Sequence, residues 1–352
     1  MGKHSAVRKR KRQGERDALV KRGRMFLIKQ GNYLSALVVA GLLSVVVLPY
    51  FSEQDLLKEG VDVTGKFFAK YEDLLKSDNQ HFIRPDLIFS EATVVLSEDK
   101  SSEFKVEHVY IPNPGEDTFK EQFESNTTIL LSMKQFLWPL GAVLYRLKKG
   151  LMFAWGWCRE RTSAWFLRRY FFKEAPADEI KFAEDMSSVC HSHYSLFQKY
   201  CPFLAQPLME FCEKFDMKTL TPAPGFGNIT VTFNFSSAQH FDEDFAWACG
   251  VWYNKLSATP KQLRDGLKPI QSGGHFFCPS LRCAFLLDAD AVFLAWHSKR
   301  HLHGTTLFEH IGKTRIGTSM QLTKKHVHAT FACMNKFAYK QEDCPVAMDY
   351  LI

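Results

Sequence analysis

The chain has 352 residues, of which 46% are hydrophobic and 24% are charged, and its formal net charge is +7. This composition excludes wholly disordered, collagen-like and multispanning membrane proteins, and the length allows one large domain or two ordinary ones. The 9 cysteines form no short, regularly spaced framework, and their odd number leaves at least one thiol unpaired. We therefore expect a reducing compartment rather than a disulfide scaffold.

Residues 1–30 carry most of the positive charge. They contain eleven Lys and Arg against two acids, Glu15 and Asp17, so this segment has a charge of +9 and the rest of the chain sums to −2. We expect a disordered basic arm here. The run RKRKR at 8–12 fits nuclear import or nucleic-acid contact, the flank of a membrane segment, or a solvated tail without a partner.

Residues 31–52 contain an almost wholly apolar stretch, LSALVVAGLLSVVVLPYF at 34–51. Eighteen such residues reach the lower limit for a helix that spans a membrane, and the basic residues before them would place the N-terminus in the cytosol. The stretch also fits a buried helix of a globular domain. A single-pass membrane anchor and a buried helix both remain open from the sequence.

Residues 53–124 form a mixed α/β region that the pattern determines poorly. An amphipathic helix is expected over 53–76, and two strands are expected within 88–111, separated by the polar turn EDKSSE. The stretch 129–173 is helical in pattern and rich in aromatic residues. At least one further amphipathic helix is expected within 178–216.

From Ile229 onward the pattern changes to short strands and turns. Seven strand-like runs follow one another: ITVTFNF, ACGVWY, HFFCP, CAFLL, AVFLAWH, RIGTSMQL and HATFACM. Strands at such short spacing indicate a sandwich or barrel, and the helical block before them makes the whole an α+β protein.

A set of metal-binding side chains follows these strands. His240 and Asp242 come after ITVTFNF, and on an extended chain the two side chains of an H-x-D motif point to the same face. A second histidine, His303, comes shortly after AVFLAWH. Two imidazoles and one carboxylate form the facial triad that holds non-haem Fe(II) and leaves three coordination positions open.

Arg315 opens the run RIGTSMQL, twelve residues after His303. Its guanidinium is suited to grip the far carboxylate of a 2-oxo acid through two parallel hydrogen bonds. Ser319 and Gln321 alternate with Gly317 on the same run, so they are candidates to face the same pocket as Arg315. An equally good interpretation makes them ordinary polar residues of a strand.

The region 138–173 has the composition of a nucleic-acid surface, because basic side chains can follow phosphates and aromatic rings can stack on bases. Its basic residues are Arg146, Lys148, Lys149, Arg159, Arg161, Arg168, Arg169 and Lys173. Its aromatic residues include Trp138, Trp155, Trp157, Trp165 and Tyr170. The alternative is an amphipathic helix pair with aromatic residues in the core.

The segment 229–323 resembles the double-stranded β-helix core of Fe(II)- and 2-oxoglutarate-dependent dioxygenases, and it is most similar to the TET/JBP-like oxygenases that are abundant in basidiomycete fungi. The matching motifs are HFDEDFA at 240–246, GVWY at 250–253, GGHFFCP at 273–279, DADAVF at 288–293, HLHGTT at 301–306 and RIGTSMQL at 315–322.

The resemblance implies a double-stranded β-helix (jelly-roll) with supporting helices before it, so that residues 125–352 form the catalytic region. It implies that His240, Asp242 and His303 bind Fe(II) and that Arg315, with Ser319 nearby, binds 2-oxoglutarate. His301 offers a second choice for the distal ligand, and the small residue Gly304 favours His303.

Three functions remain open from the sequence. The first is a nuclear dioxygenase that oxidises a methylated base such as 5-methylcytosine, and whose basic arm and region 138–173 bind nucleic acid. The second is a protein hydroxylase anchored in a membrane through 34–51. The third is a non-enzymatic, mobile-element-associated relic of the fold. The sequence does not determine the oligomeric state.

Overall fold

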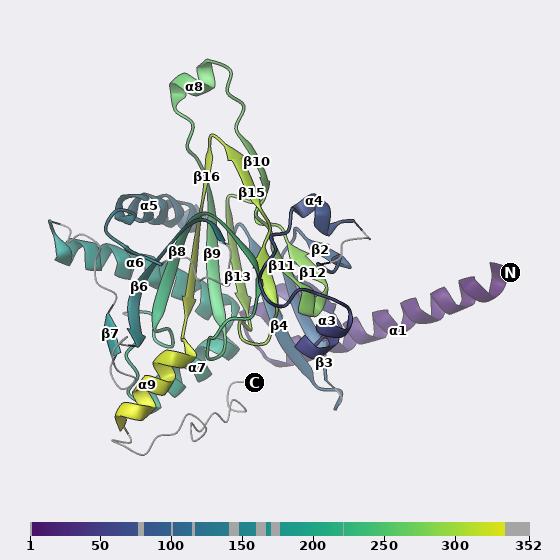
Figure 1. Cartoon of the computed structure of the whole chain (residues 1–352). Helices are drawn as coiled ribbons and strands as arrows, with labels where there is room; N and C mark the ends of the chain where they lie inside the picture. Colours follow the sequence, from purple (N-terminus) through teal and green to yellow (C-terminus); the bar gives the residue numbers. More distant parts are fainter. Residues whose placement is uncertain are drawn as a thin grey trace.

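The computed structural model describes residues 2–76, 81–99, 101–114, 117–140, 148–159, 167–169, 177–220 and 222–334. Most strands join a large, curled and mostly antiparallel sheet, with helices packed against its outside (Figure 1). The chain is an α+β protein, and its double-stranded β-helix core has two halves that are joined by one long strand, β8 (Asn228–His240).

The first half of the core, the major sheet, is antiparallel between all neighbours. Its strands lie in the order β4 (Phe104–Pro112), β13 (Ala291–Trp296), β9 (Ala248–Leu256), β16 (Lys313–Gln321), β8 and β6 (Lys148–Arg159). Side chains alternate across it. Val231 and Phe233 enter the apolar core, whereas Thr230 and Thr232 line the interior of the curled sheet.

The second half, the minor sheet, begins at the end of β8. Its strands follow in the order β14 (His303–Thr305), β11 (Phe276–Cys278), β12 (Cys283–Phe285) and β2 (Leu87–Phe89). The strands β10 (Ile270–Gly273) and β15 (Phe308–Ile311) form a separate antiparallel pair. Because β8 passes from one half to the other, its last residue, His240, lies at the seam between them.

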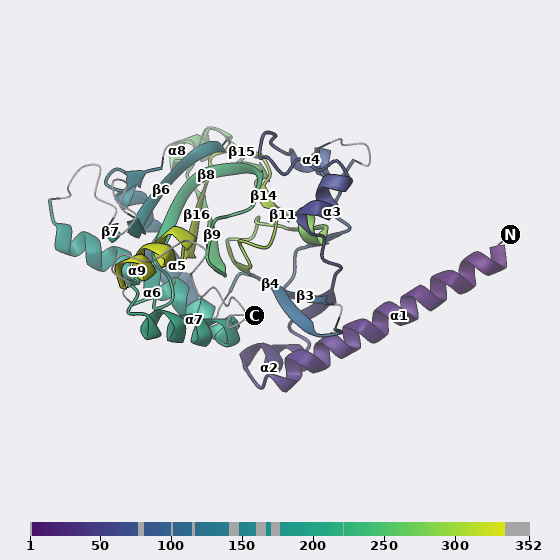
Figure 2. The ribbon, with the colours of Figure 1, turned by 60° about the horizontal axis from the view of Figure 1, so that its bottom comes forward.

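Helices cover the outer face of the major sheet (Figure 2). They are α5 (Asp117–Met133), α6 (Glu179–Tyr200), α7 (Pro202–Lys214) and α9 (Lys324–Met334). Val189 and Phe197 of α6 belong to the same buried cluster as Val231 of β8 and Val251 of β9. The expected packing of helices on the β-core is therefore confirmed. Two short elements, α8 (Pro260–Arg264) and the 3₁₀ helix η1 (Pro279–Leu281), lie in connections between strands.

Two expectations for secondary structure after residue 128 are wrong. The helical pattern over 129–173 ends with α5, and β5 (Trp138–Pro139), β6 and β7 (Leu167–Arg169) follow it, because β6 pairs with β8 along most of its length. The run HATFACM is not a strand and belongs to α9, since the buried residues Val327 and Phe331 lie four apart on one helix face.

The basic N-terminal segment is a helix in place of the expected disordered arm. Residues Gly2–Lys29 form α1, which projects away from the body of the protein (Figure 2). Its last turns are anchored to the body of the protein. Leu27 is buried, Arg22 forms an ion pair of 2.8 Å with Glu98, and a Cβ at Gly23 would contact Leu96 at 3.0 Å.

The apolar stretch 34–51 forms neither of the two expected structures. It is divided into the short helix α2 (Tyr33–Val39) and the strand β1 (Ser44–Val47), which pairs in parallel with β3 (Thr93–Glu98). Gly41, at φ +74°, turns the chain between them, and the β-branched valines of β1 favour a strand. Within the described part of the chain, no helix is long and apolar enough to cross a membrane.

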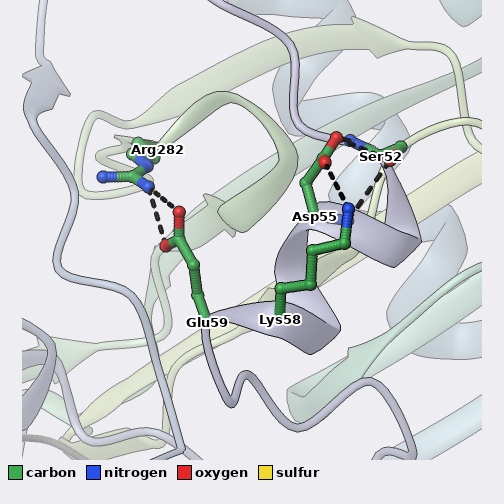
Figure 3. A network of polar contacts seen from close by, with 5 residues as sticks. All are labelled: Ser52, Asp55, Lys58, Glu59 and Arg282. Atoms are coloured by element: carbon green, nitrogen blue, oxygen red, sulfur yellow. Dashed lines mark hydrogen bonds and ion pairs between the residues drawn. The ribbon is translucent and has the colours of Figure 1, made fainter.

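Residues after this stretch attach to both halves of the core. The two strands expected within 88–111 are confirmed, since β3 and β4 form an antiparallel pair and β4 continues to β13. Two short helices, α3 (Glu53–Lys58) and α4 (Tyr71–Leu74), replace the single helix expected over 53–76. The carboxylate of Glu59 binds Nη2 of Arg282 at 2.5 and 2.7 Å, which joins the end of α3 to the minor sheet (Figure 3).

Candidate active site

Three predicted site residues meet where β8 pairs with β14. His240 is the last residue of β8 and His303 is the first of β14, and the two are direct partners in the antiparallel pair. The carboxylate oxygens of Asp242 lie 3.4 Å from Nε2 of His240 and 3.2 Å from Nε2 of His303. Because the three ligand atoms lie within 4.8 Å of one another, one metal ion placed among them can reach all three.

Backbone carbonyls determine the protonation of both imidazole rings. Nδ1 of His240 lies 2.7 Å from the carbonyl oxygen of Ala238, and Nδ1 of His303 lies 2.9 Å from that of His301. A carbonyl oxygen only accepts, so each Nδ1 carries a proton and donates it. In the neutral form, each ring then has its lone pair on Nε2, on the side of Asp242. Two lone pairs and a carboxylate that converge in this way fit a cation, and this donor set fits Fe(II).

Asp242 is held in its charged form. Burial raises the pKa of this carboxyl group. When the rings of His240 and His303 also carry a proton on Nε2, their charges and hydrogen bonds oppose burial and lower the pKa well below its ordinary value. The group is therefore a carboxylate at neutral pH, which is the form that binds metal.

Aromatic packing fixes the orientation of the His303 ring. Phe276 stacks on it with ring centroids 5.3 Å apart and an angle of 13° between the planes, and Trp296 packs edge-on at 5.9 Å. The next residue, Gly304, has to be small, since a Cβ there would lie 2.9 Å from the ring of Phe277. His303 is thus positioned by packing as well as by its Nδ1 hydrogen bond.

A cavity of about 270 Å³ opens beside His240, Asp242 and His303. Its other walls combine polar and aromatic side chains, which include Thr230, Thr232, Ser319, Gln321, Trp252, Phe276 and Trp296. Ser319 lies in this wall. The cavity can therefore enclose a flat, partly polar molecule next to the three converging ligand atoms.

Several residues that line the cavity were not predicted from the sequence. Thr230 and Thr232 were identifiable from the alternation of ITVTFNF, because their side chains share the face of β8 opposite to Val231. Trp252 and Trp296 carried no comparable signal. Aromatic residues are as common in strand interiors as in binding sites.

Arg315 lies outside the lining of this cavity. Its guanidinium donates to four acceptors of the protein itself: Oδ1 of Asn254 at 2.9 Å and the carbonyl oxygens of Gly273 at 3.3 Å, Gly274 at 2.5 Å and Leu287 at 2.7 Å. The ring of Phe308 lies 4.3 Å below it. Since guanidinium has five N–H donors, one remains for a ligand.

The sequence model of the Tet-like 2OG-Fe(II) oxygenase superfamily matches residues 116–307, which is more than half of the chain. The chain belongs to this superfamily. The resemblance found in the sequence is therefore confirmed. The protein is a 2-oxoglutarate-dependent oxygenase, an oxidoreductase whose cofactor is Fe(II) and whose co-substrate is 2-oxoglutarate.

Two solved structures are distantly similar to this Tet-like oxygenase. One is NgTET1 in complex with 5mC DNA, with 10% identity and a TM-score of 0.40 over 78% of this chain and 92% of that chain. The other is a bsmA homologue from Methylobium petroleophilum PM1, with 11% identity and a TM-score of 0.30 over 62% of this chain and 89% of that chain. No curated protein matches the chain.

The two candidates for the distal ligand of the Tet-like oxygenase have different surroundings. His303 faces Asp242, whereas the ring of His301 is fully buried on the other side of the segment and lies 2.8 Å from Oε2 of Glu107. His301 and His303 are two positions apart but do not share a face, because the regular strand begins only at His303.

The predicted nucleic-acid region 138–173 lies largely outside the described residues. Residues 141–147, 160–166 and 170–173 belong to this undescribed part. Of the aromatic side chains that are described, Trp155 packs on Phe182 with ring centroids 5.3 Å apart, against the core of the oxygenase. Its half-buried ring therefore packs against the protein, but on the strand β6 and not on the helix pair of the alternative interpretation.

Proposed function

We propose that this Tet-like oxygenase oxidises a methylated base, such as 5-methylcytosine, in nucleic acid, and that His240, Asp242 and His303 hold its Fe(II). The observation that carries the proposal is the convergence of these three side chains, with ligand atoms within 4.8 Å, beside a cavity with aromatic walls. When bound, Fe(II) with 2-oxoglutarate and dioxygen supplies hydroxylation of a C–H bond, coupled to decarboxylation of 2-oxoglutarate to succinate.

The side chains around the iron position would orient the two substrates. A base can stack against the indole rings of Trp252 and Trp296, while Thr230 and Gln321 offer hydrogen-bonding groups to its edge. A base inside a duplex cannot reach such a cavity, so the substrate must be single-stranded or must rotate out of the helix.

For 2-oxoglutarate, we place the far carboxylate near Ser319 and the end of Arg315. Arg315, Gly317 and Ser319 lie on one face of β16, and the last two line the cavity. The one guanidinium N–H that the protein leaves available supports a single charge-assisted hydrogen bond. This contact is smaller than the bidentate grip that the sequence predicted, because four other donors already hold the fold together.

Contact with nucleic acid would come chiefly from α1. Its free half carries the run RKRKR at 8–12 and extends into solvent, where a positive field can attract phosphates without displacing any part of the core. A nucleic-acid substrate and this basic run are both compatible with a nuclear enzyme. No described feature favours a membrane-anchored protein hydroxylase or a non-enzymatic relic over this proposal.

The test is nucleoside mass spectrometry after incubation of the purified chain with Fe(II), ascorbate, 2-oxoglutarate and oligonucleotides. Matched single-stranded and duplex oligonucleotides should carry 5-methylcytosine or unmodified cytosine, and Asp242→Ala serves as the inactive control. We expect 5-hydroxymethylcytosine only from methylated substrate and active enzyme. Iron-dependent succinate formation without any oxidised base, on either strand form, would refute the choice of substrate while leaving the oxygenase chemistry intact.

A further inference from the structure

A second cluster of metal-binding side chains lies behind the proposed iron site. His108 of β4, Cys278 of β11 and His301 come from three separate segments, and their ligand atoms lie within 4.8 Å of one another. All three residues have no exposed surface. None of them belongs to the cavity beside His240, Asp242 and His303.

The histidines of this cluster have ring nitrogens without a partner among the described residues. Both ring nitrogens of His108 and Nδ1 of His301 are buried and form no hydrogen bond. A buried polar atom without a partner costs about 1 to 3 kcal/mol, so three such atoms in one place are a substantial penalty. A bound cation would remove the penalty at two of the three atoms, Nδ1 of His301 and one nitrogen of His108, because it pairs with one lone pair of each ring.

Glu107 prepares His301 for this role. Its Oε2 lies 2.8 Å from Nε2 of His301, so that nitrogen carries the proton and the buried Nδ1 keeps a lone pair for a metal. The other oxygen, Oε1, binds the hydroxyl of Ser97 and lies 3.0 Å from Nη1 of Arg300. A carboxylate that fixes the ring of a ligating histidine in this way is a common support of metal sites.

We propose that His108, Cys278 and His301 bind a structural zinc ion. One thiolate and two imidazoles suit zinc, whereas the carboxylate-containing set at Asp242 suits Fe(II). A fourth donor is near, since Cys283 is the cross-strand partner of Cys278. Zinc bonds of about 2.0 Å to nitrogen and 2.3 Å to sulfur place ligand atoms about 3.5 Å apart, which is within the 4.8 Å that separates the ligand atoms of this cluster at most.

The zinc would stabilise the segment that presents His303. The carbonyl oxygen of His301 accepts the Nδ1 proton of His303, so a metal on His301 also fixes the acceptor that orients the distal iron ligand. Phe276 lies between the two sites, with ring centroids 5.3 Å from His303 and 6.1 Å from His108. The two ions would therefore share a rigid wall but no ligand.

The first experiment measures metal content in a full-length chain without its iron site. In the double variant His240→Ala, Asp242→Ala, elemental analysis should find about one zinc per chain after gel filtration. Replacement of this zinc by Co²⁺ should give thiolate-to-cobalt charge-transfer absorption in the near ultraviolet and strong visible bands of tetrahedral cobalt. Absence of zinc from this variant, together with absence of a thiolate band after addition of Co²⁺, would overturn the proposal.

The second experiment assigns the ligands on the same background. Cys278→Ser should abolish the thiolate band, and Glu107→Gln should weaken zinc about 10- to 100-fold in a chelator competition. Matched controls are Cys190→Ser, a buried thiol on α6, and His326→Ala, a buried histidine whose ring nitrogens also have no partner among the described residues. Zinc retained in full by Cys278→Ser, or lost equally in the controls, would contradict the assignment.

Discussion

His301 and His303 are two positions apart, and their surroundings place them in different clusters. The Nε2 atom of His303 faces Asp242 at 3.2 Å, and that of His301 faces Glu107 at 2.8 Å. The sequence motif HLHGTT offers both imidazoles and cannot show which carboxylate each will meet. That choice depends on β4, which brings Glu107 from a position almost two hundred residues earlier in the chain.

Removal of His303 should therefore have a different effect from removal of His301. His303→Ala should lower iron-dependent succinate formation by more than about 100-fold, because one imidazole and Asp242 are too few to hold the metal. His301→Gln should leave a functional iron site, since the amide can still bond Glu107. Succinate assays well below each variant's melting temperature provide the comparison. An equal loss of activity in the two folded variants would show that the ligands are misassigned.

Arg315 and Ser319 should also have different roles, the first in stability and the second in binding of 2-oxoglutarate. Arg315→Ala should lower the free energy of unfolding by about 3 kcal/mol or more, because it leaves three buried carbonyl oxygens without their donor. Ser319→Ala removes one hydrogen bond to the carboxylate, worth about 1.5 kcal/mol or more, which corresponds to a roughly 10-fold higher KM for 2-oxoglutarate at unchanged stability. Urea unfolding and steady-state kinetics on both variants test this. A fully stable Arg315→Ala variant would mean that its contacts do not support the fold.

At the scale of elements, the order of strands was largely predictable, and the pairing between distant segments was not. Six of the seven runs after Ile229 are strands, because alternation and turn residues define them locally. The sequence patterns at 34–51 and 148–159 fit a helix as well as they fit a strand. Part of the first segment became β1 and the second became β6, because β3 and β8 offer them edges, and such long-range partners leave no mark in a local pattern.

The contact between the helix layer and the sheet gives a prediction for pH dependence. On α6, Nε2 of His193 lies 2.6 Å from the hydroxyl of Tyr253 on β9, and burial lowers the pKa of this histidine to about 3. The unfolded chain binds a proton there near pH 6.5, whereas the folded protein does not. The free energy of unfolding should therefore fall as pH decreases from about 6.5 toward 3.

His193→Gln should make this decrease with pH less steep, since one proton uptake on unfolding is removed. The matched control is His191→Gln, an exposed position on the same helix, which should keep the wild-type slope. Urea titrations at several pH values between 7 and 4 measure the effect. If both variants show the wild-type slope, His193 does not remain neutral in the folded protein.

At the scale of the whole molecule, the basic segment and the proposed active site lie in different parts of the chain. Residues 1–30 carry +9 and the remainder carries −2, while the proposed site lies at the seam of the two halves of the core. The composition predicted the basic segment correctly, but not its helical form or its anchoring through Leu27. Truncation of all thirty residues would consequently remove part of the core, and a shorter deletion is the informative one.

Deletion of residues 1–17 should weaken nucleic-acid binding and reduce its dependence on salt. Each lost phosphate contact lowers the slope of log K against log salt by about 0.9 for duplex DNA. Succinate formation without nucleic acid should not change, since the packed residues of α1 remain. Neutralisation of Lys261 and Arg264 on α8 is the control for exposed basic residues elsewhere. Binding that is unaffected by the deletion would remove α1 from the proposed interface.

The most direct test of the central claim is the consumption of 2-oxoglutarate by purified Asp242→Ala in the presence of Fe(II) and oxygen. Asp242 contacts both imidazoles of the proposed iron site and is its only carboxylate ligand in the described cluster. We predict that the wild-type protein forms succinate in an iron-dependent manner and that the variant, folded as judged by circular dichroism, does not. Succinate formation by the variant at a rate near that of the wild type would contradict the account.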